Sequence, residues 1–257
     1  MSLIKSDEDI KAMREGGKIL SRALAAAAKA VRPGIFISEL EEIAEKSLRA
    51  DGAVPSFKGY RGSRNEPAFP TTLCISIGPE VVHGIANRKI KLKEGDIVSL
   101  DIGCEYQGRF TDMAVTVPVG KISVEDEELM RVTREALFAG VAAAKPKGDV
   151  RDISAAVEKH VKPHGFGIVT ALVGHGVGHA VHEAPNVPNY TYPRQPSVPL
   201  KPGMCLAIEP MITMGNSEVQ TADDGWTAIT VDNSIAAHFE VTIVITKNGH
   251  EILTPLP

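Results

Sequence analysis

The sequence repeats itself in outline, and this internal repeat constrains the fold more than any other feature. A shift of 113 residues lays the segment 33–52 over 146–165, with a proline and a glycine matched at the two ends. A shift of 108 lays LKEGDIVSLD (92–101) over LKPGMCLAIE (200–209), so that an acid falls on an acid. Matches in the same order along the chain indicate two structurally related halves.

A third match, at a shift of 92, lays the His-Gly pair at His83 over the pair at His175. Each half is too small to bury its sheet face alone, so the two should pack together. We therefore predict an α+β fold of two pseudo-twofold-related halves, with an antiparallel sheet and flanking helices. A single domain should span 1–257, with halves of roughly 1–120 and 121–257. A site at the junction would draw on both halves.

Helix signals alternate with apolar β-like runs. The first helix should start with a capping box of Ser6 and Asp9, and the second at Ser38 with Glu41. The four expected helices lie within 6–33, 38–51, 123–146 and 149–165. The β-like runs are 94–103, 110–117, 203–211 and 238–246.

Four acids lie in the middle of these apolar runs, and they are Asp101, Asp112, Glu209 and Glu240. An isolated carboxylate in a dry interior must be paired, protonated or bound to a metal. A single acid in a strand usually faces solvent, but four of them favour a site, and lysine and arginine are absent from the runs around them. Four carboxylates with an imidazole form a ligand set for Mn, Fe, Co or Zn. So much negative charge suits two ions that share bridging carboxylates.

The stretch LVGHGVGHAVHEAP (172–185) holds three histidines at helical spacing. Its glycines argue against a helix, because each costs a helix interior about 1 kcal/mol relative to alanine. His175 could lie at a strand end facing the ions, and His182 could reach the same cleft from a neighbouring turn. His179 is expected to be structural or to face solvent.

Composition narrows the class of protein. The net charge of −4 gives no reason to expect a nucleic acid or a membrane as the main partner. Three widely spaced cysteines argue against a disulfide framework, and no apolar run is long enough to span a membrane. A cytoplasmic protein is therefore expected. The basic run NRKIKLK (87–93) is expected to be a solvated strand edge.

Six segments together resemble the type I methionine aminopeptidases and keep the motif order of that family over nearly the whole chain. They are HGIA (83–86), SLDIGCEYQGRFTDMAVT (99–116), GHGVGHAVHEAPNVPNY (174–190), LAIEPMI (206–212), DDGWTAIT (223–230) and AHFEVTIVIT (237–246). The resemblance implies the internally duplicated pita-bread fold, in agreement with the repeat.

The resemblance also implies residue roles. Asp101 would bind one metal ion only, Asp112 and Glu240 would bridge both, and His175 and Glu209 would complete the shell of the other. His182 would contact the substrate carbonyl, and His83 would lie near the scissile amide. The methionine pocket would be lined by Phe69, Cys74 and Trp226.

The implied activity is removal of the N-terminal methionine from nascent chains when the second residue is small. A metal-bridging hydroxide would attack the first peptide carbonyl, with Glu209 as the proton shuttle. The implied cofactors are two divalent ions (Co, Mn, Fe or Zn), and the expected state is a monomer, with the ribosome as a candidate partner.

Two departures from the family pattern bear on the site. Val241 stands where a histidine is common, which puts the orientation of Glu240 in question, and Val181 stands where an aromatic is common, which would widen the methionine pocket. Two alternatives stay open at this point. They are a proline-directed aminopeptidase P or prolidase of the same fold, and a binding module that holds no metal.

Overall fold

The computed structural model describes residues 2–62 and 67–257. Its helices are α1 (Asp7–Ala30), α2 (Ile37–Ala50), α3 (Val124–Ala143), α4 (Val150–Val161) and the short 3-10 helix η1 (Lys162–His164). Its strands are β1 (Val54–Pro55), β2 (Leu73–Ile77), β3 (Glu80–Val82), β4 (Ile97–Tyr106), β5 (Arg109–Pro118), β6 (Gly167–Ile168), β7 (Gly174–Gly176), β8 (Glu183–Val187), β9 (Cys205–Ile208), β10 (Met211–Thr213), β11 (Val219–Thr221), β12 (Ala228–Thr230), β13 (Ala236–His238), β14 (Glu240–Ile245) and β15 (His250–Ile252). Among the described residues, no helix is both long and apolar enough to cross a membrane.

Side-chain caps fix the starts of three helices where the sequence predicts them. Ser6 accepts a hydrogen bond from the backbone N–H three residues on and begins α1, and Ser123 does the same for α3. Asp149 caps α4 through the N–H of Arg151. Such caps satisfy donors that the first helical turn leaves without a partner.

The predicted start of the second helix is wrong. Helix α2 begins at Ile37, one residue before Ser38, and Glu39 rather than Glu41 accepts the backbone N–H of the N-cap residue. Glu41 is buried instead and accepts the backbone N–H groups of residues 72–73 at 2.6 and 2.7 Å. Burial raises the pKa of Glu41, and its carboxyl group holds the entry into β2.

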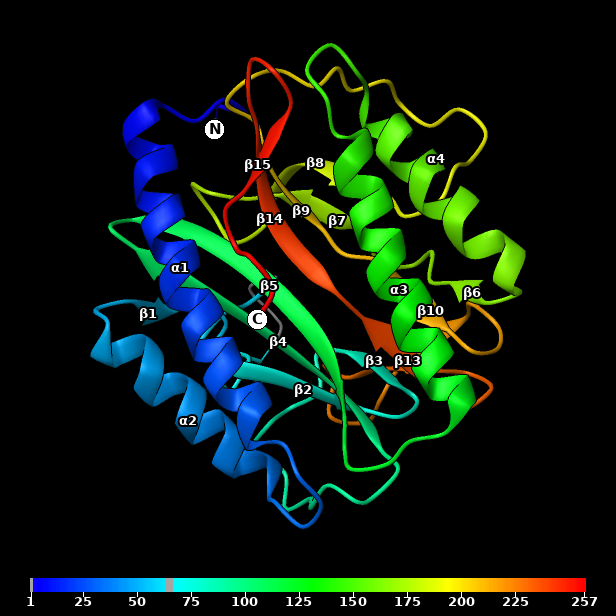
Figure 1. Ribbon diagram of the computed structural model, residues 1–257. Coiled ribbons are helices and arrows are strands. Elements are labelled where there is room, and N and C mark those ends of the chain that lie inside the picture. Colours follow the sequence, from blue (N-terminus) through cyan, green and yellow to red (C-terminus); the bar gives the residue numbers. More distant parts are fainter. Residues whose placement is uncertain (1, 63–66) are drawn as a thin grey trace.

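The main sheet confirms the predicted pseudo-twofold arrangement. Its strands run in the order β1-β4-β5-β14-β9-β7-β8, with β2 paired to β4, β15 paired to β14, and every pair antiparallel. Strands β5 and β14 form the centre, and the repeated segments β4 and β9 lie on either side of them. Figure 1 shows α1 and α3 flanking this central pair. The approximate twofold axis therefore passes between β5 and β14.

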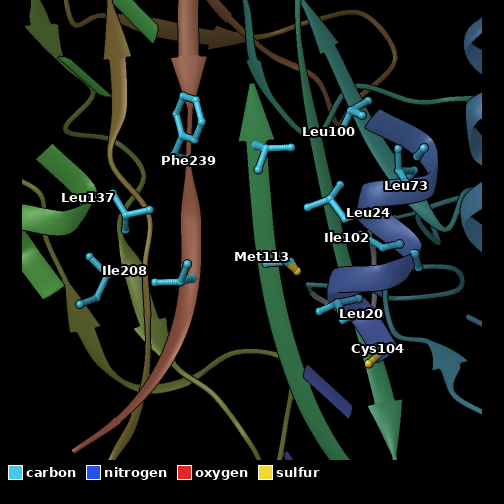
Figure 2. Packing of buried hydrophobic residues seen from close by; sticks show 14 of the residues in the cluster. Leu20, Leu24, Leu73, Leu100, Ile102, Cys104, Met113, Leu137, Ile208 and Phe239 are labelled. Carbon is cyan, nitrogen blue, oxygen red and sulfur yellow. The ribbon is translucent and has the colours of Figure 1, made fainter. Parts of the chain in front are cut away.

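One face of the central strands forms the main hydrophobic core. Four fully buried side chains lie in register across the sheet, and they are Ile102, Met113, Val241 and Ile208. Leu20 and Leu24 from α1 and Leu137 from α3 belong to the same buried cluster (Figure 2). The three cysteines are free, as the sequence predicts, and all three are buried. The helices therefore cover one face of the sheet and leave the other face for the site.

Candidate active site

All ten predicted site residues line one pocket of about 80 Å³. They are Phe69, Cys74, His83, Asp101, Asp112, His175, His182, Glu209, Trp226 and Glu240. The set draws on strands from early and late in the sequence, because β4 and β5 precede residue 120 and β7, β9 and β14 follow it. The structure thus brings together residues that the sequence only suggested to be neighbours.

Strand register places the acids on the face opposite the helices. Asp112 pairs with Gly103, two residues beyond Asp101 on β4, so the two acids share a face as predicted. Glu240 pairs with Ala114, two residues beyond Asp112 on β5. All three acids are buried, with 8% of Asp101, 3% of Asp112 and 2% of Glu240 exposed.

Among the described residues, no lysine or arginine forms an ion pair with any of the four acids, and only the imidazoles of His175 and His238 lie close to Glu209 and Glu240. Burial raises the pKa of Asp101 to about 7. Burial, with repulsion from neighbouring acids, raises the pKa values of Asp112, Glu209 and Glu240 well above the ordinary range.

One buried oxygen on each of Asp101, Asp112 and Glu240 lacks a hydrogen-bond partner within residues 2–62 and 67–257. Partnerless carboxylate oxygens crowded in a dry pocket are the donors that a divalent cation satisfies. The donor atoms of Asp112, His175 and Glu240 all lie within 4.8 Å of one another. The residues present therefore fit a metal centre.

His175 lies on β7, and one of its two ring nitrogens forms a hydrogen bond to the backbone. Its Nδ1 donates to the Gly176 carbonyl at 2.9 Å, and its Nε2 lies 3.4 Å from Glu209 Oε1. Burial lowers the pKa of His175 to about 3, so the ring is neutral and Nε2 has a free lone pair. Asn189 in turn holds the backbone at Glu209 by donating to its carbonyl at 3.0 Å.

Two glycines explain why this histidine stretch is extended rather than helical. A Cβ at Gly174 would lie 2.5 Å from the Ala207 carbonyl oxygen, and a Cβ at Gly176 would lie 2.1 Å from that of Ala184. Only glycine lets β7 approach its neighbours so closely. The argument against a helix is confirmed.

The other two histidines of the stretch differ in their surroundings. The His182 ring lies at the pocket with its centroid 4.3 Å from that of His175, and its Nδ1 is 2.9 Å from the Tyr60 hydroxyl oxygen. His179 lies outside the pocket lining and contacts Asp9 at 3.3 Å. The structural reading of His179 is confirmed.

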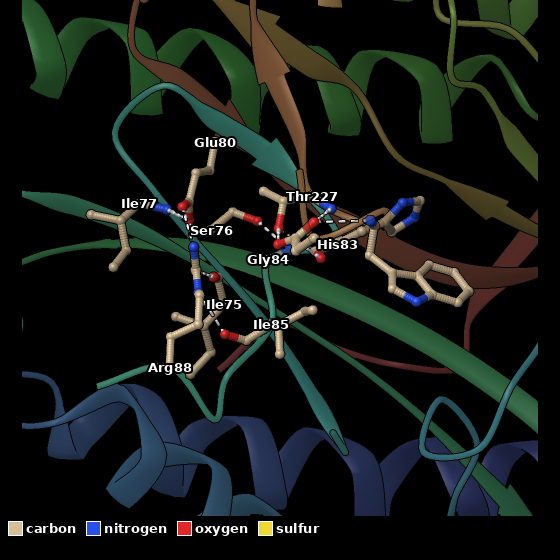
Figure 3. A network of polar contacts seen from close by, with 11 residues as sticks. Ile75, Ser76, Ile77, Glu80, His83, Gly84, Ile85, Arg88 and Thr227 are labelled. Atoms are coloured by element: carbon tan, nitrogen blue, oxygen red, sulfur yellow. Dashed lines mark hydrogen bonds and ion pairs between the residues drawn. The ribbon is translucent and has the colours of Figure 1, made fainter. Parts of the chain in front are cut away.

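A polar network holds the turn that carries His83 (Figure 3). His83 has a positive φ of 61°, and a Cβ at the following Gly84 would lie 2.1 Å from a carbonyl oxygen of β2. Arg88 pairs with Glu80 and donates to the carbonyls of Ile75 and Ile85 at 3.0 and 2.7 Å. These contacts fix the unusual backbone that presents the His83 side chain.

The basic run 87–93 is only partly as predicted. Lys89, Lys91 and Lys93 are exposed, but the run lies outside the named strands. Arg88 is half-buried because Glu80 and two backbone carbonyls bind its guanidinium group. The periodicity of the lysines gave no sign of this structural role.

Apolar side chains close the rest of the pocket. Phe57, Phe69, Cys74 and Val181 form one buried cluster, against which Trp226 packs. The rings of Phe69 and Trp226 pack edge to face, with their centroids 5.2 Å apart. Val181, one of the two departures from the family pattern, is thus part of the apolar wall. The other departure, Val241, lies in the core on the helix face and does not contact the pocket.

Sequence reasoning missed three side chains near the acids. Phe57 and Tyr60 line the pocket from a segment without periodic pattern. His238, which is 1% exposed, points its Nε2 toward Glu209 Oε2 at 3.8 Å and Glu240 Oε2 at 3.9 Å. Burial lowers the pKa of His238 to about 3. Its position two residues before Glu240 was the available signal, since alternate residues of an extended chain share a face.

Comparison with known proteins agrees with this site. The family model "Metallopeptidase family M24" matches residues 11–247. Methionine aminopeptidase of Clostridium perfringens is 46% identical over 99% of both chains, and methionine aminopeptidase 1 of Bacillus subtilis is 44% identical over 99% of both.

Solved structures give the same relationship. The crystal structure of methionine aminopeptidase from Thermotoga maritima has a TM-score of 0.92 and 42% identity, over 98% of both chains. Prolidase from Pyrococcus furiosus shares the pita-bread fold with a TM-score of 0.78 and 25% identity, but this chain covers only 66% of it. A metallopeptidase family implies use of a divalent metal, for which the pocket has the donors. The chain therefore belongs to metallopeptidase family M24 and is an enzyme of its methionine aminopeptidase branch.

Proposed function

We propose that this enzyme acts on nascent polypeptides and removes the N-terminal methionine when the second residue is small. One observation carries the proposal, namely that partnerless buried acids and a closed apolar cluster form walls of the same small pocket. An apolar wall would select the methionine side chain, and the acids would hold the metal ions that act on its peptide bond. We also propose a single-domain monomer that meets its substrates at the ribosome.

For the metal centre we propose two divalent ions, drawn from Co, Mn, Fe and Zn. Asp112 and Glu240 would contact both, Asp101 one, and His175 with Glu209 the other. When bound, such ions supply Lewis-acid polarisation of a carbonyl and a nucleophile at neutral pH. The free lone pair on His175 Nε2 and the partnerless acid oxygens support this assignment.

Three side chains of the protein would move or stabilise charge. Glu209, next to the proposed ions, would take up a proton and pass it to the leaving amine. If the Tyr60 hydroxyl donates to Nδ1 of His182, the proton of that ring is on Nε2, which can donate to the oxygen of the attacked carbonyl. His83 approaches from the opposite half and would contact the scissile amide.

Peptide cleavage tests the proposed specificity. Purified enzyme loaded with Co, Mn, Fe or Zn should cleave Met-Ala-Ser and Met-Gly-Ser and act poorly on Met-Lys-Ser, because we propose, from the family relationship, that the position of the second residue is crowded. Ala-Pro-Ala should not be cleaved. Equal rates on Met-Ala-Ser and Met-Lys-Ser would exclude the proposed selectivity for a small second residue. Protein that binds no divalent ion would support the metal-free module.

Paired histidine variants test the mechanism. His182→Ala should keep its metal and lose about 10²–10³-fold in kcat, since one donor to the developing oxyanion is removed. Its KM should change less, because the contact tightens as charge develops. His179→Ala is the matched control and should stay within a few-fold of wild type. Metal analysis with steady-state kinetics measures both, and loss of metal from His182→Ala would overturn its assigned role.

A further inference from the structure

We propose that His238 is a sixth side-chain ligand of the metal centre, contributing Nε2 to the ion held by Glu209 and Glu240. The inference rests on the proposed metal centre and goes beyond the five donors assigned above. It gives that centre a second imidazole next to His175.

The backbone of His238 is fixed on both sides of its Cα atom. Its N–H donates to Thr116 Oγ1 at 2.8 Å, and its carbonyl accepts from the same hydroxyl group at 2.8 Å. Ser99 lies 2.8 Å from that hydroxyl in turn. Strand β13 also pairs His238 with Met211. The backbone is therefore held in one place, and the nearly complete burial of the ring limits its movement away from the acids.

The ring nitrogens of His238 have no hydrogen-bond partner within the described parts of the chain, although the side chain is 1% exposed. Nε2 lies 3.8 Å from Glu209 Oε2 and 3.9 Å from Glu240 Oε2. These separations are too long for hydrogen bonds, which end near about 3.2 Å. A neutral nitrogen and two carboxylate oxygens that face one another without touching leave a space that suits a cation.

Donor spacing agrees with this reading. The three donor atoms of Glu209, His238 and Glu240 all lie within 4.8 Å of one another. Two donors at about 2.1 Å from a shared ion are separated by roughly 3–4 Å, depending on the angle between them. Glu240 also belongs to the triad with Asp112 and His175, so each triad holds one imidazole and two carboxylates. Two imidazole nitrogens on the ion held by Glu209 would favour Co, Fe or Zn over Mn.

The test compares zinc with manganese in metal-stripped protein. His238→Gln should lose at least about 10-fold in zinc affinity by isothermal titration, and its manganese affinity should fall less. His164→Gln, at the end of η1 and away from the pocket, is the matched control and should bind both ions as wild type does. An unchanged zinc-to-manganese ratio in His238→Gln would overturn the proposal.

A spectroscopic readout separates a ligand from a residue that only orients the acids. In ¹⁵N-labelled wild-type protein, Nε2 of His238 should move to the metal-bound chemical-shift range when zinc is added. The signal is assigned by its absence from His238→Gln, or from His238→Ala if the first variant does not fold. A His238 signal that zinc leaves in place would overturn the proposal even if affinity falls.

His175→Gln separates this inference from the proposed function. If wild type binds zinc, His175→Gln loses it and His238→Gln does not, only the assignment of His238 fails. If wild type binds no zinc, or if His175→Gln binds it as well as wild type does, the metal centre itself is wrong.

Discussion

Residues next to one another in the sequence form the two faces of the central sheet, one of which is the apolar core and the other the acidic pocket. On the helix face, four side chains form a buried apolar row, and on the pocket face an acid lies next to each of them in sequence. The neighbours are Asp101 and Ile102, Asp112 and Met113, Ile208 and Glu209, and Glu240 and Val241. Strands β4, β5 and β14, and the end of β9, therefore carry both the core and the site.

The difference shows where stability comes from. Full burial of an aliphatic side chain stabilises a fold by about 1.5–3 kcal/mol, whereas a buried carboxylate without a partner destabilises it. The helix face must therefore offset the pocket face whenever the acids lack a cation. Stability and function occupy alternate positions of one strand, so each can be perturbed with little direct change to the other.

The largest expected effect comes from removing a bridging acid. Asp112→Ala should abolish activity, because this carboxylate is proposed to hold both ions. Met113→Leu changes the adjacent residue on the helix face and is the matched control, since a volume-conserving swap usually costs less than about 1.5 kcal/mol. Peptide cleavage and metal titration measure both variants. Two intact metal sites in Asp112→Ala would contradict the assignment of Asp112 as a bridging ligand, and with it the proposal that the pocket face alone carries the metal centre.

A cavity on the helix face should have the reverse signature. Ile208→Ala is expected to lower the free energy of unfolding by about 2–5 kcal/mol, because Ile208 is fully buried between β14 and the helices. Its folded fraction should bind metal as wild type does, although Glu209 is the next residue. Urea unfolding and metal titration separate the two quantities. A metal affinity that falls together with stability would show that the faces are coupled.

Much of the fold could be predicted because the repeat appears in residue types. The pairing of β4 with β5 and the equivalence of β4 and β9 follow from apolar runs that each contain one acid. The start of α2 could not be predicted, because Ser38 and Glu41 imitate a capping pair while Glu41 is used by the chain entering β2. That 1–257 forms one domain with halves meeting near residue 120 stays a prediction.

The site could be predicted where a charged side chain interrupts an apolar strand pattern. An acid in an apolar strand stands out in the sequence, and all four such acids line the pocket. Tyr60 and Phe57 could not be found, because they precede β2 in a segment without periodicity and reach the pocket through tertiary packing. His238 was missed because it ends a separate short strand, so its position opposite Glu209 depends on how β13 is placed.

The smallest expected effect is a pH dependence that belongs to the pocket face alone. In the metal-free enzyme burial raises the pKa of Asp101 to about 7 and the pKa values of the other three acids well above their usual range, which is about 4 in the unfolded chain. Above about pH 7.5 the buried histidines are almost entirely neutral in both states, so only the acids titrate differently. The folded state then binds more protons than the unfolded state, and stability should fall as pH rises from about 7.5 to 8.5. Thermal unfolding of chelator-treated protein should show a falling Tm over this range, and Glu209→Gln should flatten the slope by removing one acid. Ile208→Ala should lower the whole curve without changing its slope, and a slope that Glu209→Gln leaves unchanged would refute the assignment to the pocket face.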